Sequence, residues 1–202
     1  MVGRFCARRW VVVMAVGLML CSACGGGKTV ARAPQPSSTS TTVVSTTVAD
    51  VPSLPQPEDS PSDPYADVPV RQIGTIRIPK IGLTHPVFEG IWLTVIDNGP
   101  GHWPGSARPG EVGNTVFAGH RVTHTRPFRN IDQLVPGDQV FFDDERGTFE
   151  YRVNGMKIVT PKDTWIVDQT RARTMTIFAC HPPGSAAERI VVTGEFVATT
   201  RS

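Results

Sequence analysis

The chain has 202 residues, of which 40% are hydrophobic, 7% aromatic and 19% charged, and its formal net charge is +2 at pH 7. This length suits one ordinary domain with additional residues left over. A near-neutral charge, few aromatic side chains and no run of lysine and arginine argue against nucleic acid as a partner.

The first 24 residues have the pattern of an export signal, in which arginines precede an apolar run from Trp10 to Leu20. This run is shorter than the roughly 20 residues that a helix needs to cross a bilayer, so a permanent transmembrane helix is the weaker interpretation. Small residues before Cys24 and glycines after it resemble a bacterial lipobox, although Cys21 stands where that motif usually has leucine. We predict a signal peptide over 1–24 with lipidation of Cys24. A cleaved signal peptide, which would give a secreted protein, and an uncleaved anchor are the alternatives.

Residues 25–69 are rich in proline, serine and threonine and cannot build a hydrophobic core. We predict a disordered tether that holds a folded domain, residues 70–202, at the outer face of the cell membrane. An interaction segment for a partner is the alternative for this composition.

The folded part shows short runs of alternating apolar and polar residues between glycine and proline. Asn154-Gly155 is typical of a two-residue turn, 99–105 has the composition of a loop, and 128–134 suits one or two helical turns. The expected strands are 74–78, 84–88, 114–118, 139–142, 148–153, 156–160, 174–180 and 189–197. About eight short strands with one or two short helices predict an all-β protein, a closed or nearly closed β-barrel.

Alternation places Cys180 at the end of a strand, on the face opposite Met175 and Ile177. A loop of prolines and glycine then returns Arg189 beside this cysteine. The other cysteines lie in the predicted signal or at the lipidation position, so Cys180 is left without a disulfide partner. Such a thiol is either a small core residue or a nucleophile.

A cysteine nucleophile needs a titratable partner and a group that stabilises an oxyanion. His120 follows a predicted strand end and Gly119, whose missing side chain would permit close approach by a substrate backbone. Arg189 supplies a fixed cation. The chain order is therefore histidine, cysteine, arginine, each at a strand end.

These features, with a lipid or signal anchor and a polar tether, resemble the sortase family over residues 73–196. Several stretches match at once, and they look most like the class E branch found in actinobacteria. The matching stretches are 114–121 (Asn-Thr-Val-Phe-Ala-Gly-His-Arg), 127–138, 180–182 and 189–192.

The resemblance implies a sortase-type cysteine transpeptidase without a cofactor. Such an enzyme would cleave a Leu-Ala-X-Thr-Gly-like sorting signal between threonine and glycine. It would pass the acyl group to an amine on a cell-wall precursor or a pilin lysine. Its partners would be surface proteins that carry the signal. Cys180 would be the nucleophile, His120 the acid and base, and Arg189 the oxyanion group.

Three further residues are predicted to contact substrate. Ala179 replaces the threonine that the family usually has before its cysteine, and His124 stands where class E members commonly have tyrosine. His181 follows Cys180 and points to the opposite side if the strand continues. The two departures leave the identity of the sorting signal open.

Other functions compete with this interpretation. His120, His124, Cys180 and His181 are zinc-type ligands, but no closely spaced ligand pair supports a metal site, so none is predicted. An L,D-transpeptidase is disfavoured because its usual Ser-X-Gly-Cys sequence is absent. A non-catalytic lipoprotein barrel that binds a peptide or a cell-wall fragment remains the main alternative.

Overall fold

The structure, a computed structural model, describes residues 53–201. The predicted signal peptide with Cys24 lies outside these residues, as does the first part of the predicted tether. The strands are β1 (Gln72–Ile78), β2 (Leu83–Glu89), β3 (Gly101–His102), β4 (Gly113–Ala118), β5 (Gln139–Asp144), β6 (Gly147–Val159), β7 (Arg173–His181) and β8 (Glu188–Thr200). The helical turns are η1 (Pro79–Ile81), α1 (Leu93–Ile96), η2 (Ile131–Gln133) and η3 (Thr164–Val167).

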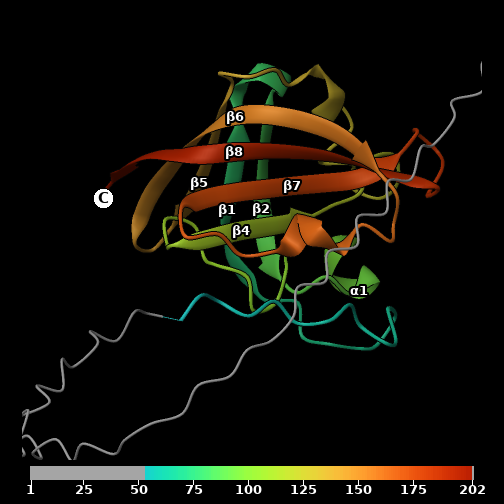
Figure 1. The fold of residues 1–202 in the computed structure, drawn as a ribbon. Helices are drawn as coiled ribbons and strands as arrows, with labels where there is room; N and C mark the ends of the chain where they lie inside the picture. Colours follow the sequence, from blue (N-terminus) through green and yellow to red (C-terminus); the bar gives the residue numbers. More distant parts are fainter. Residues whose placement is uncertain (1–52, 202) are drawn as a thin grey trace, which may run out of the picture. The chain divides into compact units, whose positions relative to one another are not determined.

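The strands form one closed barrel in the order β1-β2-β3-β4-β7-β8-β6-β5 (Figure 1). Neighbouring strands are antiparallel except for the parallel pairs β2 with β3 and β4 with β7. The fold therefore confirms the expectation of an all-β barrel with eight strands and few helices.

Two expected elements were wrong, and the errors cancel in the strand count. Asn154-Gly155 is not a turn, because β6 runs continuously from Gly147 to Val159 beside the equally long β8. Only a register shift between Val153 and Gly155 marks the place, so pairing along a full-length neighbour overrides the local turn preference. In return, the predicted loop 99–105 contains β3, which bridges β2 and β4.

Apolar side chains form two clusters on opposite faces of the strands β4, β7 and β8. Alternation along β7 sends Met175 and Ile177 into the barrel interior and Phe178 to the outer face, as predicted. The interior cluster consists of Ile76, Ile78, Val87, Phe117, Phe128, Ile131, Leu134, Val140, Phe142, Phe149, Tyr151, Val153, Met175, Ile177, Ala179, Ile190 and Val192. The outer cluster consists of Val116, Ala118, Ile166, Phe178 and Val191.

The last part of the predicted tether, residues 53–69, has no helix or strand but lies against the barrel domain. The Glu58 amide donates to the Pro104 carbonyl at 2.9 Å, and the Trp103 indole donates to the Glu58 carbonyl at 2.8 Å. Further along, the Leu93 amide at the start of α1 donates to the Pro64 carbonyl at 2.7 Å. This segment therefore belongs structurally to the domain. We name residues 54–66 the docked segment.

No helix within residues 53–201 combines the length and apolar character needed to span a membrane. The barrel closes on itself within residues 72–200, and all of its interior cluster comes from these residues. A fragment that begins at Val48 therefore contains the complete barrel, its core and the docked segment.

Candidate active site

Strand register brings the three predicted catalytic residues together. In the parallel pair β4 and β7, Ala118 is opposite Phe178, and His120 and Cys180 each follow two residues later. They therefore lie at the same edge of the barrel, where β4 and β7 both end (Figure 1). In the antiparallel pair β7 and β8, Cys180 is directly opposite Arg189. Since neighbouring strands are about 4.8 Å apart, the cysteine is flanked by the other two residues.

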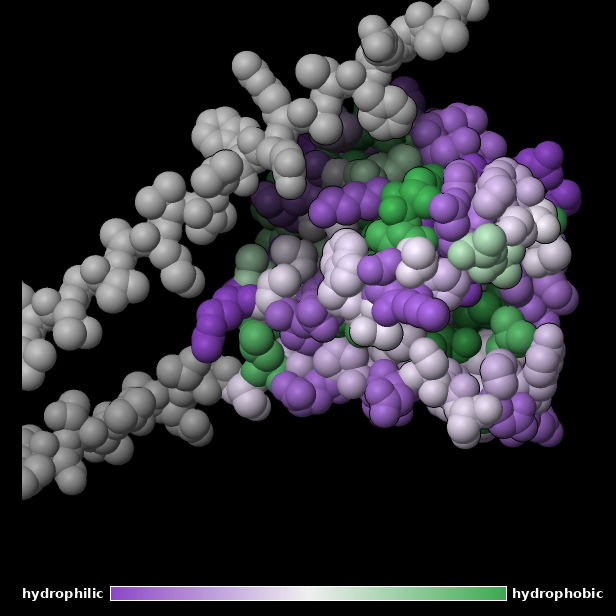
Figure 2. All heavy atoms as spheres, turned by 45° about the vertical axis from the view of Figure 1, so that its right-hand side comes forward, coloured by the Kyte–Doolittle hydropathy of each residue, from purple (hydrophilic) through white to green (hydrophobic). Residues whose placement is uncertain are grey.

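The three residues line one cavity of about 180 Å³ on the outer face of the barrel. Apart from them the cavity has an apolar wall, made by Ile91, Leu93, Ile96, Trp103, Ala118, Gly119, Phe178 and Ala179. Figure 2 shows that apolar side chains on one face of the molecule lie in hollows between polar ones. A partly buried thiol, Cys180, is therefore accessible from a largely apolar pocket.

His120 is held by a carboxylate that the sequence had not indicated. Its Nε2 lies 2.7 Å from Oδ1 of Asp97, which follows α1. The Nε2 atom of His124 lies 3.2 Å from the same oxygen, and the two imidazole rings stack with centroids 4.9 Å apart. With Nε2 bound to Asp97, Nδ1 of His120 is the ring nitrogen left for proton exchange.

Gly119 lines the cavity, and the structure adds a packing reason for a glycine here. A side chain at this position would place its Cβ 2.8 Å from the ring of Phe128, so the missing side chain makes room for Phe128. Phe128 is fully buried, and its amide donates to the His120 carbonyl at 3.1 Å. The stretch after the histidine therefore fixes the backbone of His120.

Arg189 is oriented by backbone oxygen atoms. Its Nη1 donates to the carbonyls of Ala186 and Glu188, both at 2.9 Å. Among the described residues no carboxylate forms an ion pair with Arg189, so its positive charge is not neutralised by a neighbouring side chain. A guanidinium in this position can donate to an oxyanion formed next to Cys180.

Two of the residues predicted to contact substrate, Ala179 and His181, have different surroundings. Ala179 lines the cavity, but it is only 2% exposed and belongs to the interior cluster. His181 points away from the cavity, and its Nδ1 accepts a hydrogen bond from Nη1 of Arg121 at 2.7 Å. Arg121 is buried and also pairs with Asp132 at 3.0 Å, so His181 belongs to a polar network that braces the loop after β4.

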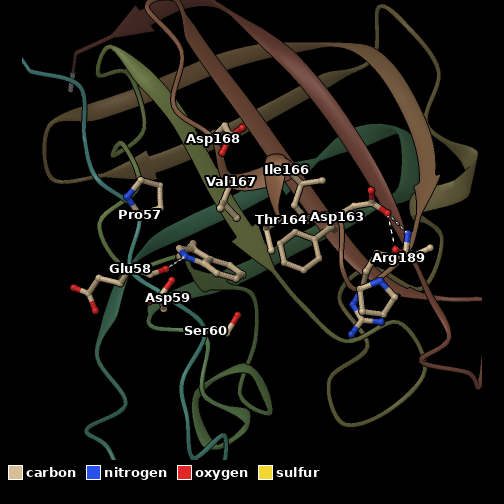
Figure 3. Close-up of a pocket in the computed structure, with 14 residues that line it drawn as sticks. Pro57, Glu58, Asp59, Ser60, Asp163, Thr164, Ile166, Val167, Asp168 and Arg189 are labelled. Carbon is tan, nitrogen blue, oxygen red and sulfur yellow. Dashed lines mark hydrogen bonds between the residues drawn. The ribbon is translucent and has the colours of Figure 1, made fainter.

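A second cavity of about 380 Å³ adjoins the first and shares Trp103, Phe178 and Arg189 with it. One wall comes from the docked segment and the other from the residues around η3. Figure 3 shows Pro57 to Ser60 on one side of this cavity, with Arg189 at the opposite end. The two cavities together form a groove that passes the cysteine.

Fold and site define a class of protein: a closed β-barrel with histidine, cysteine and arginine at one edge, where the neighbouring strands β4, β7 and β8 meet. A family model described as "Sortase domain" matches residues 76–197. Sortase D of Bacillus subtilis is 34% identical over 128 residues, which cover 61% of this chain and 63% of that protein. Sortase SrtE1 of Streptomyces coelicolor is 31% identical over 145 residues, which cover 64% of this chain and 41% of that protein.

A solved structure of a Clostridium perfringens sortase D5 transpeptidase superimposes with a TM-score of 0.59 at 35% identity, covering 63% of this chain and 79% of that one. The chain belongs to the sortase family. The match spans less than two thirds of the length of the two sequence relatives.

Proposed function

We propose that this protein is a cysteine transpeptidase that cleaves a Leu-Ala-X-Thr-Gly-like sorting signal between threonine and glycine. It transfers the acyl group to an amine on a cell-wall precursor or a pilin lysine. The observation that carries this proposal is the meeting of His120, Cys180 and Arg189 at one apolar cavity. Sortases are cysteine transpeptidases that act at the cell surface, and this chain has the family's fold and its reactive residue types.

In the first half-reaction the thiolate Sγ of Cys180, with His120 protonated, attacks the threonine carbonyl carbon. Arg189 donates hydrogen bonds to the oxyanion of the tetrahedral intermediate. The bond between threonine and glycine then breaks, His120 gives its proton to the leaving amine, and a thioester to Cys180 remains.

In the second half-reaction an acceptor amine attacks the thioester carbonyl carbon. His120 takes a proton from this amine, the carbon–sulfur bond breaks, and a new amide is released. Asp97 accepts a hydrogen bond from Nε2 of His120, which leaves Nδ1 as the ring nitrogen that exchanges the proton in both half-reactions. The Asp97 carboxylate thereby stabilises the positively charged imidazole that forms in each catalytic cycle.

The groove has a shape and a lining that suit a peptide substrate. Trp103 and Phe178 lie between the two cavities, with ring centroids 6.1 Å apart, and they offer an apolar surface for the side chains that precede the scissile bond. The absence of a threonine hydroxyl at Ala179 leaves the oxyanion to Arg189 and backbone amides.

The protein partners under this proposal are surface proteins that carry the sorting signal, and the chain is held at the outer face of the membrane by its N-terminal part. The mass of the mature N-terminus tests the attachment. A diacylglycerol adduct on Cys24 supports a lipoprotein, whereas a free N-terminus beyond residue 24 supports secretion.

The activity is tested with purified fragment 48–202 and a panel of Leu-X-X-Thr-Gly peptides, with and without triglycine, followed by mass spectrometry. We expect a thioester on Cys180 and a transpeptidation product that needs the amine. Cys180→Ala should give neither. Product formation by Cys180→Ala would contradict the role of Cys180 as nucleophile. No thioester and no product with any peptide would contradict the activity itself and favour a peptide-binding barrel.

A further inference from the structure

A cluster of metal-ligand side chains lies at the edge of the active site. Asp97, His120 and His124 each offer one ligand atom, and these atoms all lie within 4.8 Å of one another. No such group of three or more is found elsewhere among residues 53–201. The cluster comes from two segments, the end of α1 and the loop after β4.

The separations of the ligand atoms suit a tetrahedral transition metal. Zinc binds nitrogen and oxygen ligands at about 2.0–2.2 Å, so two ligands of a tetrahedral site are about 3.3 Å apart. The Asp97 oxygen lies 3.2 Å from Nε2 of His124 and 2.7 Å from Nε2 of His120. Opening the shorter pair by about 0.6 Å would bring it to the tetrahedral separation.

The loop that carries His124 has an unusual backbone. His124 has φ 51° and Arg126 has φ 48°, left-handed values that are uncommon for residues other than glycine. This conformation turns the His124 ring onto that of His120, with 22° between the ring planes. The second histidine is therefore placed beside the first by the fold of the loop.

The cluster is also open to an incoming ion. The His124 side chain is 48% exposed and Asp97 34% exposed, whereas His120 is 16% exposed and faces the cavity. Two histidines and one carboxylate leave a fourth position for water, a donor set typical of zinc.

We propose that Asp97, His120 and His124 form a regulatory site for a divalent transition metal, with Zn²⁺ as the best-fitting ion. An ion on Nε2 prevents the ring from carrying a proton on both nitrogens. His120 therefore cannot form the imidazolium whose Nδ1 proton goes to the leaving amine. Bound Zn²⁺ therefore inhibits the enzyme reversibly. The inhibition rests on the role of His120 in the proposed function, whereas the binding does not.

Binding is measured by isothermal titration calorimetry of ZnCl₂ into EDTA-treated, dialysed fragment 48–202 at pH 7.5, with MgCl₂ as the hard-cation comparison. We expect one Zn²⁺ per chain and no binding of Mg²⁺, which prefers oxygen ligands. His124→Ala and Asp97→Asn should each weaken Zn²⁺ binding at least tenfold. His181→Ala, which removes a nearby histidine outside the cluster, and Cys180→Ala should leave the affinity unchanged.

Inhibition is measured as the loss of transpeptidation with added Zn²⁺ and its recovery with EDTA, compared between the wild-type fragment and His124→Ala at equal residual turnover. The inhibitory concentration should rise at least tenfold in the variant. No Zn²⁺ binding, binding that His124→Ala leaves intact, or binding lost in Cys180→Ala would overturn the site. If no peptide is turned over, calorimetry still decides on the metal site, while the proposed function fails separately.

Discussion

The two faces of the β4-β7-β8 part of the barrel differ in how completely they are packed. The inner face belongs to the cluster of seventeen buried residues that fills the whole barrel, whereas the outer cluster has only five buried residues. Tyr151 is fully buried in the interior, and this burial raises the pKa of its hydroxyl to about 12. Its oxygen accepts a hydrogen bond from the Gly110 amide at 2.8 Å, so the buried polar atom is satisfied.

The outer face has the opposite character. Its apolar residues line two cavities instead of filling all the space, and the candidate reactive residues lie among them. Adjacent residues of one strand therefore serve different purposes: Ile177 supports the barrel, whereas Phe178 and Cys180 face the groove. Changes on the two faces should separate stability from activity.

The largest expected effect is on activity, from Arg189→Met. Loss of the group that donates to the oxyanion should lower kcat/KM by about 10²–10³-fold. The unfolding free energy should change little, because the guanidinium forms hydrogen bonds only to nearby backbone carbonyls. Steady-state kinetics and urea unfolding of the same variant test both parts. Unchanged kcat/KM would remove Arg189 from the mechanism.

The sharpest test of the two faces compares neighbours on β7. Ile177→Ala should lower the unfolding free energy by about 2–5 kcal/mol, because it opens a cavity in the closed interior. Phe178→Ala should cost less stability, since part of its surroundings is already cavity, but it should raise KM for the peptide. Urea unfolding and peptide kinetics measure the pair. Equal losses of stability without a change in KM would contradict the distinction.

Removal of the docked segment should have an intermediate effect on stability and on peptide binding. Fragment 70–202 lacks the hydrogen bonds to Trp103, Pro104 and Leu93, and we expect its unfolding free energy to be about 1–2 kcal/mol lower than that of fragment 48–202. Its peptide KM should also change, because one wall of the second cavity is gone.

A control separates docking from a general effect of chain length. At Gly105, with φ 73°, a Cβ would clash with the Gln56 carbonyl oxygen. Gly105→Ala should therefore cost more stability in fragment 48–202 than in fragment 70–202, where only the backbone strain remains. Equal costs in the two fragments would show that the segment does not dock there in solution.

The smallest expected effect concerns acid stability where β1 meets β5. A hydrogen bond from Arg77 holds the pKa of the Asp143 carboxyl below its usual value, with a further contribution from Thr148, against the opposing effect of burial. Because the folded-state pKa is lowered, this stabilisation is present above about pH 4 and is lost as the pH falls further.

The variant Asp143→Asn should therefore unfold with less dependence on pH than the wild type below about pH 4. The difference at neutral pH should be at most about 1 kcal/mol, since the Arg77 and Asp143 side chains are 39% and 29% exposed. Thermal unfolding between pH 3 and pH 7 measures this. Parallel pH profiles for the two proteins would show that the pair does not contribute.

The sequence by itself determined the features that depend on local pattern. Two-residue alternation assigned Ile177 and Phe178 to opposite faces, and the loop after Cys180 predicted its pairing with Arg189. The total of eight strands was correct although two of its components were not. Side-chain period and turn residues carry this information because they act between neighbours along the chain.

Tertiary structure alone decided the rest. Asp97 reaches His120 across 23 positions, and Trp103 bonds to Glu58 across 45, separations over which no periodic signal operates. Asn154-Gly155 lost its turn because β8 offers a continuous partner. The reactive trio is indicated by strand ends in the sequence, whereas its carboxylate, its groove wall and its candidate metal site arise only when distant segments meet.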